Sequence, residues 1–404
     1  MSMGARFCPD KTFNPRKLLI CIKSKTTMKI TKLVCTPLLV PNKVPYHWAH
    51  GVIMGATVIL VEVQTDEGIS GYGECIGTPS AEAICCYLKL AERMIVGHDP
   101  FENARLLREI YHRFFQAHGN CSAPRYAGML LAGLEMALWD VMGKSTDKAV
   151  HELLGGALHD KICYFGFVQG ETPDELAAHA RILCDEGCEV IYAKVGRGDK
   201  LDYEIVKSIR DAIGNEKRLR IDPNEHWDPQ TAVRMIAKLS QFDIDFVEQP
   251  SHCESISALA QIHAGSPVSI SADQAVFTPF DTYDVCREKA ADIIVLGLHE
   301  TGGISRFRQC AGIAEAAGLN ICIHGLHETG ITTCAMIQAA STIPNIDDGN
   351  QYMNHLLAWD IIDSPNLELQ KGKLPIVSGP GLGFSLNIDA VEAAKQAFLE
   401  SDQS

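Results

Sequence analysis

Three acidic residues stand at the ends of short apolar segments that follow one another at nearly constant intervals. Asp222 ends Arg-Ile-Asp, Glu248 ends Phe-Val-Glu and Asp273 ends Ser-Ala-Asp, with spacings of 248−222 = 26 and 273−248 = 25 residues. In neighbouring parallel strands these carboxylates would meet at one edge of the sheet and repel one another unless a cation lay between them. Oxygen ligands favour Mg²⁺ over zinc. The alternative is that each acid caps the following helix.

A lysine and a histidine hold the same position in two other segments. Lys194 ends Val-Ile-Tyr-Ala-Lys, 222−194 = 28 residues before Asp222, and His324 ends Ile-Cys-Ile-His. A lysine that faces a protein interior is unfavourable unless it is paired or functional. Beside a metal in a dry site its pKa is expected to fall from about 10.4, which frees the amine to act as a base. His324 is the candidate acid or second base. The alternatives are a lysine that extends to solvent and a structural histidine.

The segments that carry these residues alternate with amphipathic stretches, a pattern typical of β/α units. Strand-like runs recur seven times between residues 162 and 323, and a weaker eighth lies around 355–361. Such a series predicts a (β/α)8 barrel of the TIM type, in which reactive groups gather at the carboxyl ends of the strands. Gly297 takes the strand-end position between Asp273 and His324.

The chain before the barrel has a different pattern. Residues 28–63 are rich in apolar and β-branched residues, and residues 81–144 are helical in pattern, so we predict an α+β capping domain. The predicted fold class is therefore α/β, with an α+β cap followed by a (β/α)8 barrel. The expected parts are a disordered extension at 1–27, the cap at 28–156, the barrel at 157–364 and a segment at 365–404 that returns to the cap.

Composition restricts the class of protein further. The 404 residues exceed what one core supports, and the formal net charge of −14 disfavours nucleic acid as a partner. Fifteen cysteines in a chain of this size indicate free thiols rather than a disulfide scaffold. No apolar run reaches the length of about 18 residues that crosses a bilayer. We expect a cytoplasmic homo-oligomer that acts on a small-molecule carboxylate, without a nucleic-acid or membrane partner.

Five short motifs resemble landmarks of one enzyme family. They are Gly-Tyr-Gly-Glu at 71–74, Glu-Met-Ala-Leu-Trp-Asp at 135–140, Leu-Leu-Gly-Gly at 153–156, Thr-Gly-Gly at 301–303 and Gly-Pro-Gly-Leu-Gly at 379–383. With the strand-end residues, they make residues 28–395 similar to the mandelate racemase and muconate lactonizing branch of the enolase superfamily.

The resemblance implies a role for each matching position. Asp222, Glu248 and Asp273 match the three metal ligands, and Lys194 matches the second lysine of a Lys-x-Lys motif. The chemistry implied is removal of the proton next to a carboxylate, which gives an enediolate stabilised by Mg²⁺.

The departures from the family pattern bear on the reaction type. Tyr192 replaces the first lysine, and Gly297 replaces the aspartate or lysine found at the end of strand six. His324 is therefore expected to lack the aspartate that would orient it. His299, two residues after Gly297, is a substitute candidate for catalysis.

With one base on one face, we expect a lyase that dehydrates a sugar acid, in which Lys194 removes the α-proton and His324 or water assists loss of hydroxide. The alternatives are a racemase, epimerase or cycloisomerase that pairs Lys194 with His299 or His324, and a barrel without catalytic activity. The candidate substrate-binding residues are Asn224, Tyr192, Glu328, His47 and His50.

Overall fold

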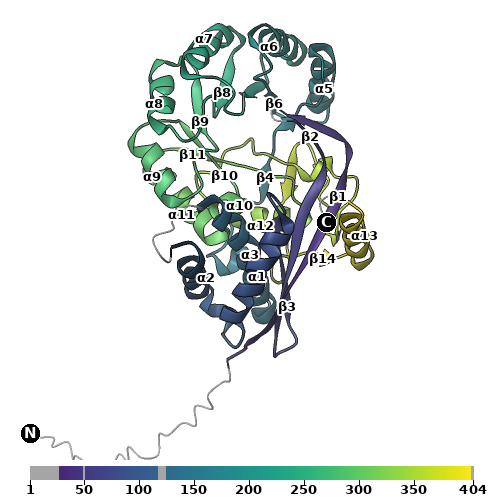
Figure 1. Cartoon of the computed structure of the whole chain (residues 1–404). Helices are drawn as coiled ribbons and strands as arrows, with labels where there is room; N and C mark the ends of the chain where they lie inside the picture. The colour runs from purple at the N-terminus through teal and green to yellow at the C-terminus, as the bar shows by residue number, and fades with distance from the viewer. Residues whose placement is uncertain (1–26, 49–50, 117–123, 402–404) are drawn as a thin grey trace, which may run out of the picture.

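The protein consists of a capping region and a barrel, which Figure 1 displays for the whole chain. The computed structural model describes residues 27–48, 51–116 and 124–401. The extension expected at 1–27 therefore lies almost wholly outside the described residues. His50 also lies outside them, and of His47 the backbone alone is described.

The cap begins with a three-stranded antiparallel sheet. Its strands are β1 (Ile30–Trp48), β2 (Gly51–Thr65) and β3 (Ser70–Ile76), in the order β1-β2-β3. The pairing of β1 with β2 shifts register between Pro41 and Tyr46, where prolines 41 and 45 offer no amide hydrogen. Beyond this irregularity the strand continues to Trp48, and the ring of Tyr46 lies 5.7 Å from that of Phe167 in the barrel.

Helices pack against this sheet through a buried apolar layer. Glycines allow the closest approach, because a Cβ at Gly73 would overlap the carbonyl group of Gly133, and one at Gly71 that of Ala137. The Gly-Tyr-Gly motif thus lets β3 lie directly on the helix that contains Gly133 and Ala137. The cap elements are α1 (Ala81–Ile95), a 3₁₀ turn (Pro100–Glu102), α2 (Asn103–Tyr111), a π-helical turn (His112–Gln116), α3 (Pro124–Thr146) and α4 (Val150–Leu153).

The barrel contains seven parallel strands whose spatial order follows the sequence. They are β5 (Gly166–Phe167), β6 (Val190–Lys194), β7 (Arg218–Asp222), β8 (Ile244–Glu248), β9 (Ser269–Ala272), β10 (Ile293–Leu296) and β11 (Asn320–Ile323). The helices between and after them are α5 (Pro173–Asp185), α6 (Asp199–Ile213), α7 (Pro229–Leu239), α8 (Ile256–Gly265), α9 (Pro279–Arg287), α10 (Leu298–Thr301), α11 (Ile304–Ala316) and α12 (Gly330–Ala340). A 3₁₀ turn (Ser240–Phe242) follows α7. The predicted fold class, an α+β cap followed by a barrel, is confirmed.

An irregular segment at residues 345–351 closes the ring between β11 and β5. The amide of Ile321 donates to the carbonyl of Asn345 at 2.9 Å, and the amide of Phe165 donates to that of Asn350 at 2.9 Å. The guanidinium of Arg220 anchors this segment by donating to Asp347 Oδ1 at 2.6 Å. The eighth unit predicted around 355–361 is therefore wrong in position. Its place is taken by Asn-Ile-Asp-Asp-Gly-Asn-Gln, which has no apolar run to reveal a strand.

The C-terminal part packs beside the cap. Val391 and Ala394 share an apolar cluster with Leu38 and Val58 of the cap sheet, and α13 lies next to β1 in Figure 1. The elements here are a 3₁₀ turn (Asn354–Leu356), β12 (Ile362–Ser364), β13 (Lys373–Pro375), β14 (Ser385–Leu386) and α13 (Ile388–Leu399). β13 pairs with β4 (Lys161–Cys163), which leads into the barrel.

The twelve cysteines within the described part of the chain are free thiols. Across residues 27–48, 51–116 and 124–401, no helix combines the length and apolar character required to cross a membrane.

Candidate active site

The barrel carries the chemically reactive residues at the carboxyl ends of its strands. β6, β7 and β8 end at Lys194, Asp222 and Glu248, while Asp273 and His324 directly follow β9 and β11. Because parallel strands share one carboxyl edge, these five side chains gather at one mouth of the barrel.

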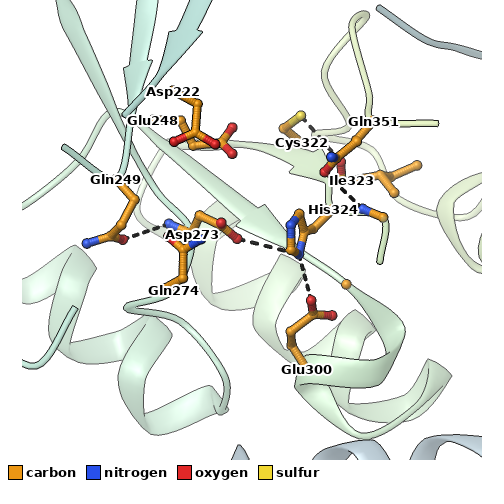
Figure 2. Close-up of polar contacts among 12 residues, drawn as sticks. Asp222, Glu248, Gln249, Asp273, Gln274, Glu300, Cys322, Ile323, His324 and Gln351 are labelled. Atoms are coloured by element: carbon orange, nitrogen blue, oxygen red, sulfur yellow. Dashed lines mark hydrogen bonds and ion pairs between the residues drawn. The ribbon is translucent and has the colours of Figure 1, made fainter. Parts of the chain in front are cut away.

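The three acids form a buried cluster. Asp222, Glu248 and Asp273 are 0, 2 and 4% exposed, and Figure 2 shows the first two carboxylates together, with Asp273 facing His324. Burial, and then the charges of the other two acids, raises the pKa of Glu248 well above its usual range. Asp273 Oδ2 has no hydrogen-bond partner among the described residues. A buried, all-oxygen donor set with an unpaired acceptor fits a hard divalent cation such as Mg²⁺.

The alternative role of these acids as helix caps is excluded by the helices that follow them. The caps of α7, α8 and α9 are Asp228, Ser255 and Thr278, whose side chains accept hydrogen bonds from backbone amides of the first turn. The strand-end acids lie five to seven residues earlier along the chain. Their side chains remain available to the mouth of the barrel.

Lys194 lies against these acids. Its ammonium donates to Asp222 Oδ2 and, at 3.2 Å, to the hydroxyl of Tyr192. Burial alone would lower the pKa of Lys194, but the charges of Asp222 and Glu248 outweigh it and raise the pKa above its usual range. The fall in pKa expected from the sequence therefore requires a cation that neutralises these carboxylates.

His324 is held by a carboxylate that the sequence interpretation missed. Its Nδ1 lies 2.6 Å from Glu300 Oε1 and 3.6 Å from Asp273 Oδ1, as Figure 2 shows. Burial lowers the pKa of His324, but these two acids outweigh it and raise the pKa to about 10. The aspartate of strand six is absent, but the implication that nothing orients His324 is wrong. Glu300 supplies an orienting carboxylate from α10 and not from a strand end.

Gly297 explains how Glu300 reaches this position. A Cβ at Gly297 would overlap the Glu300 carboxylate group. The missing side chain at the end of β10 thus creates the space that the carboxylate fills three residues later. A glycine at a strand end followed by an acid within one helical turn was the available signal in the sequence.

Three further predicted residues surround this arrangement. Asn224 has φ +46°, and its backbone N–H donates a hydrogen bond to Asp222 Oδ1 at 2.6 Å. Its side-chain Oδ1 has no hydrogen-bond partner within the described chain. His299 Nε2 lies 3.0 Å from Thr332 Oγ1 on α12, and burial lowers its pKa to about 4. Glu328 is buried, and burial raises its pKa well above normal.

Two other residues lie near the site, and one of them, Gln249, was not predicted. Gln249 directly follows β8, and its Oε1 accepts hydrogen bonds from the backbone amides of Asp273 and Ala275, at 3.0 and 3.1 Å. These bonds fix the turn that carries Asp273. Tyr46 of β1 is buried, with its ring 5.0 Å from that of His327. The cap therefore contributes an aromatic side chain next to the barrel loops.

The cap also anchors the helix that follows His324. Glu74 on β3 is fully buried and accepts hydrogen bonds from the Thr329 amide, at 3.0 Å, and from the hydroxyls of Thr329 and Thr332. Burial raises its pKa to about 7. These bonds tie the start of α12 to the cap sheet.

Comparison with known proteins gives matches along most of the chain. The mandelate racemase / muconate lactonizing enzyme N-terminal domain model matches residues 30–155, and the enolase C-terminal domain-like model matches residues 175–391. Muconate cycloisomerase 1 of Rhodococcus opacus is 31% identical over 375 residues, which cover 91% of this chain and 98% of the relative. The L-Ala-D/L-Glu epimerase of Bacillus subtilis is 28% identical over 371 residues, 88% and 97% of the two chains.

A solved structure gives the same result. The dipeptide epimerase from Enterococcus faecalis, complexed with Mg and the dipeptide L-Leu-L-Tyr, matches with a TM-score of 0.81 and 26% identity, and the match covers 88% of this chain and 99% of that chain. With its cap, barrel and ring of strand-end acids, this chain belongs to the mandelate racemase and muconate lactonizing branch of the enolase superfamily.

Proposed function

We propose that the protein is a Mg²⁺-dependent isomerase that moves the proton on the carbon next to a carboxylate, as a racemase or epimerase. One observation carries this proposal: Lys194 and the His324–Glu300 pair stand at separate positions on the ring, with the acids of β7 to β9 between them. A group on each side of the bound acid is what proton transfer between two faces requires.

Asp222, Glu248 and Asp273 are the residues that would hold the metal. When bound, Mg²⁺ supplies positive charge where negative charge develops on the substrate carboxylate. The solved epimerase that contains Mg supports this choice of ion.

The side chains of this chain would then divide the proton transfers. Lys194 Nζ takes the α-proton on one face, and His324 gives or takes a proton on the other. Glu300 accepts a hydrogen bond from Nδ1–H of His324, so Nε2 is the ring nitrogen left to face the substrate. Asn224, with its unpaired amide oxygen, is a candidate to contact a substrate hydroxyl or amine.

Dehydration of a sugar acid becomes the second candidate. Dehydration was preferred over racemisation because Gly297 leaves no acid or base at the end of β10. That reason no longer holds, because Glu300 supplies a carboxylate that orients His324. What favours dehydration is the charge on His324, because a protonated imidazole can donate to a departing hydroxide. The names of the compared relatives, cycloisomerase and epimerase, weigh toward isomerisation.

Incubation with a library of sugar acids, dipeptides and substituted amino acids in D₂O tests the proposal. Isomerisation predicts deuterium at the α-carbon of recovered or inverted acid, without a 2-keto product, in the wild type. A 2-keto product would select dehydration. If Mg²⁺ does not bind in a calorimetric titration, both catalytic candidates fail and the alternative of a barrel without catalytic activity remains.

A further inference from the structure

The hydroxyl of Tyr192 lies at the centre of the charged cluster. It is within 2.6 Å of Asp222 Oδ2 and 2.8 Å of Glu248 Oε1, and it receives a hydrogen bond from Lys194 at 3.2 Å. Two of the three candidate metal ligands therefore converge on one neutral oxygen.

Aromatic packing fixes the place of that hydroxyl. Tyr192 is 0% exposed, and its ring stacks on Phe165 at 4.4 Å between centroids with a 5° angle between planes. Phe167 covers it from another side, at 5.2 Å. Because the ring cannot change rotamer without breaking these aromatic contacts, the hydroxyl is held at a fixed position relative to Asp222 and Glu248.

A phenol has one proton to donate, so the proton is shared between the two carboxylate oxygens that approach it. We propose that Tyr192 is a positioning residue that holds Asp222 and Glu248 in the orientation that binds the divalent cation. It does so without adding positive charge. This inference rests on the proposed function, because the cation is the one that function requires.

The absence of charge on the phenol matters because of its location. A lysine, which the family pattern has at this position, would add a second ammonium beside Lys194. The neutral hydroxyl organises the carboxylates and leaves Lys194 as the cation that touches Asp222.

Calorimetric titration of the metal-free full chain with Mg²⁺ alone tests the inference. Groups that orient metal ligands typically contribute about 10- to 100-fold to metal affinity. We expect Tyr192→Phe to weaken Mg²⁺ binding by about tenfold or more. Tyr352→Phe is the matched control, because it removes a buried hydroxyl that donates to the carbonyl of Leu367 and to Asn354. Its Mg²⁺ affinity is expected to equal that of the wild type.

The outcomes separate the inference from the proposed function. If the wild type binds Mg²⁺ and Tyr192→Phe binds it equally well, with melting temperature and circular dichroism unchanged, the inference is wrong and the proposed function stands. Equal losses in Tyr192→Phe and Tyr352→Phe would also overturn it, because they indicate a general packing effect. If the wild type binds no Mg²⁺, the inference and the proposed function both fail.

Discussion

The mouth of the barrel has two regions that are built differently. From β6 to β9, each reactive side chain belongs to the last residue of a strand or to the next one, as with Lys194 and Asp222. From β10 to β11, the imidazole stands at a strand end, but its carboxylate, Glu300, comes from α10 and occupies the space above Gly297.

Both regions place a cationic group against an acid, but different parts of the structure determine the distance. Lys194 and Asp222 are paired in the register of two adjacent strands, so the backbone ladder sets their separation. The distance from His324 to Glu300 depends on a four-residue helix and on one missing side chain. The first region is expected to be robust to changes in loops, and the second to depend on α10.

The largest effect is expected from Lys194→Ala, in the region determined by strands. A general base typically increases the reaction rate by about 10²- to 10⁴-fold, so turnover in Lys194→Ala should fall by about 10²-fold or more. Loss of α-proton exchange in D₂O, followed by NMR, measures it. The control is Lys207→Ala on α6, where the lysine pairs with Asp211 at the surface. If exchange persists for the epimer whose α-proton faces Lys194, this residue is not the base on that face.

Glu300→Gln tests the region that depends on α10, with an expected loss of about 10²-fold if His324 needs its partner in the transition state. The variant keeps the shape but removes one of the two charges that raise the pKa of His324 to about 10. The pKa should therefore fall toward the ordinary value of about 6.5. Activity that requires the protonated imidazole should then decline at a lower pH than in the wild type. NMR titration of the His324 ring measures the shift directly.

Stability gives an independent check on the same pair. Because the folded-state pKa of His324 lies above the unfolded value, its protonation stabilises the fold at pH below about 6.5. That contribution is lost as the pH rises toward 10. Thermal melts between these values should show a smaller decline in Glu300→Gln than in the wild type. An identical decline in both proteins would contradict the charge interaction between Glu300 and His324.

The contrast between the two regions also explains what the sequence could predict. Regular spacing and apolar strands located Asp222, Glu248 and Lys194, because strand geometry translates sequence intervals into one edge of a sheet. Glu300 escaped detection because its position depends on how α10 turns after Gly297, which no periodicity encodes. The closing segment at 345–351 escaped for a similar reason, since polar residues there are held by Arg220 and backbone hydrogen bonds instead of an apolar pattern.

Gly297→Ala should produce a smaller loss, of about tenfold, because displacement of a catalytic group by less than about 1 Å costs up to 10²-fold and Glu300 can partly adjust. Steady-state turnover measures it. Gly312→Ala on α11 is the matched control, because a Cβ there meets no atom within 4 Å. Equal activity of the two variants would mean that the space above Gly297 does not position Glu300.

Glu74→Ala is expected to affect turnover least and stability strongly, because Glu74 lies in the cap and supports the second region from outside the site. Its carboxylate accepts two hydrogen bonds from Thr329 and one from Thr332. Removing it leaves buried donors at the start of α12 without partners, at a cost of about 2–4 kcal/mol in the free energy of unfolding. Urea denaturation measures this loss, with Glu204→Ala at the surface of α6 as control. Because α12 follows the loop from His324, a loss of turnover as large as that in Glu300→Gln would mean that the cap positions the imidazole as well.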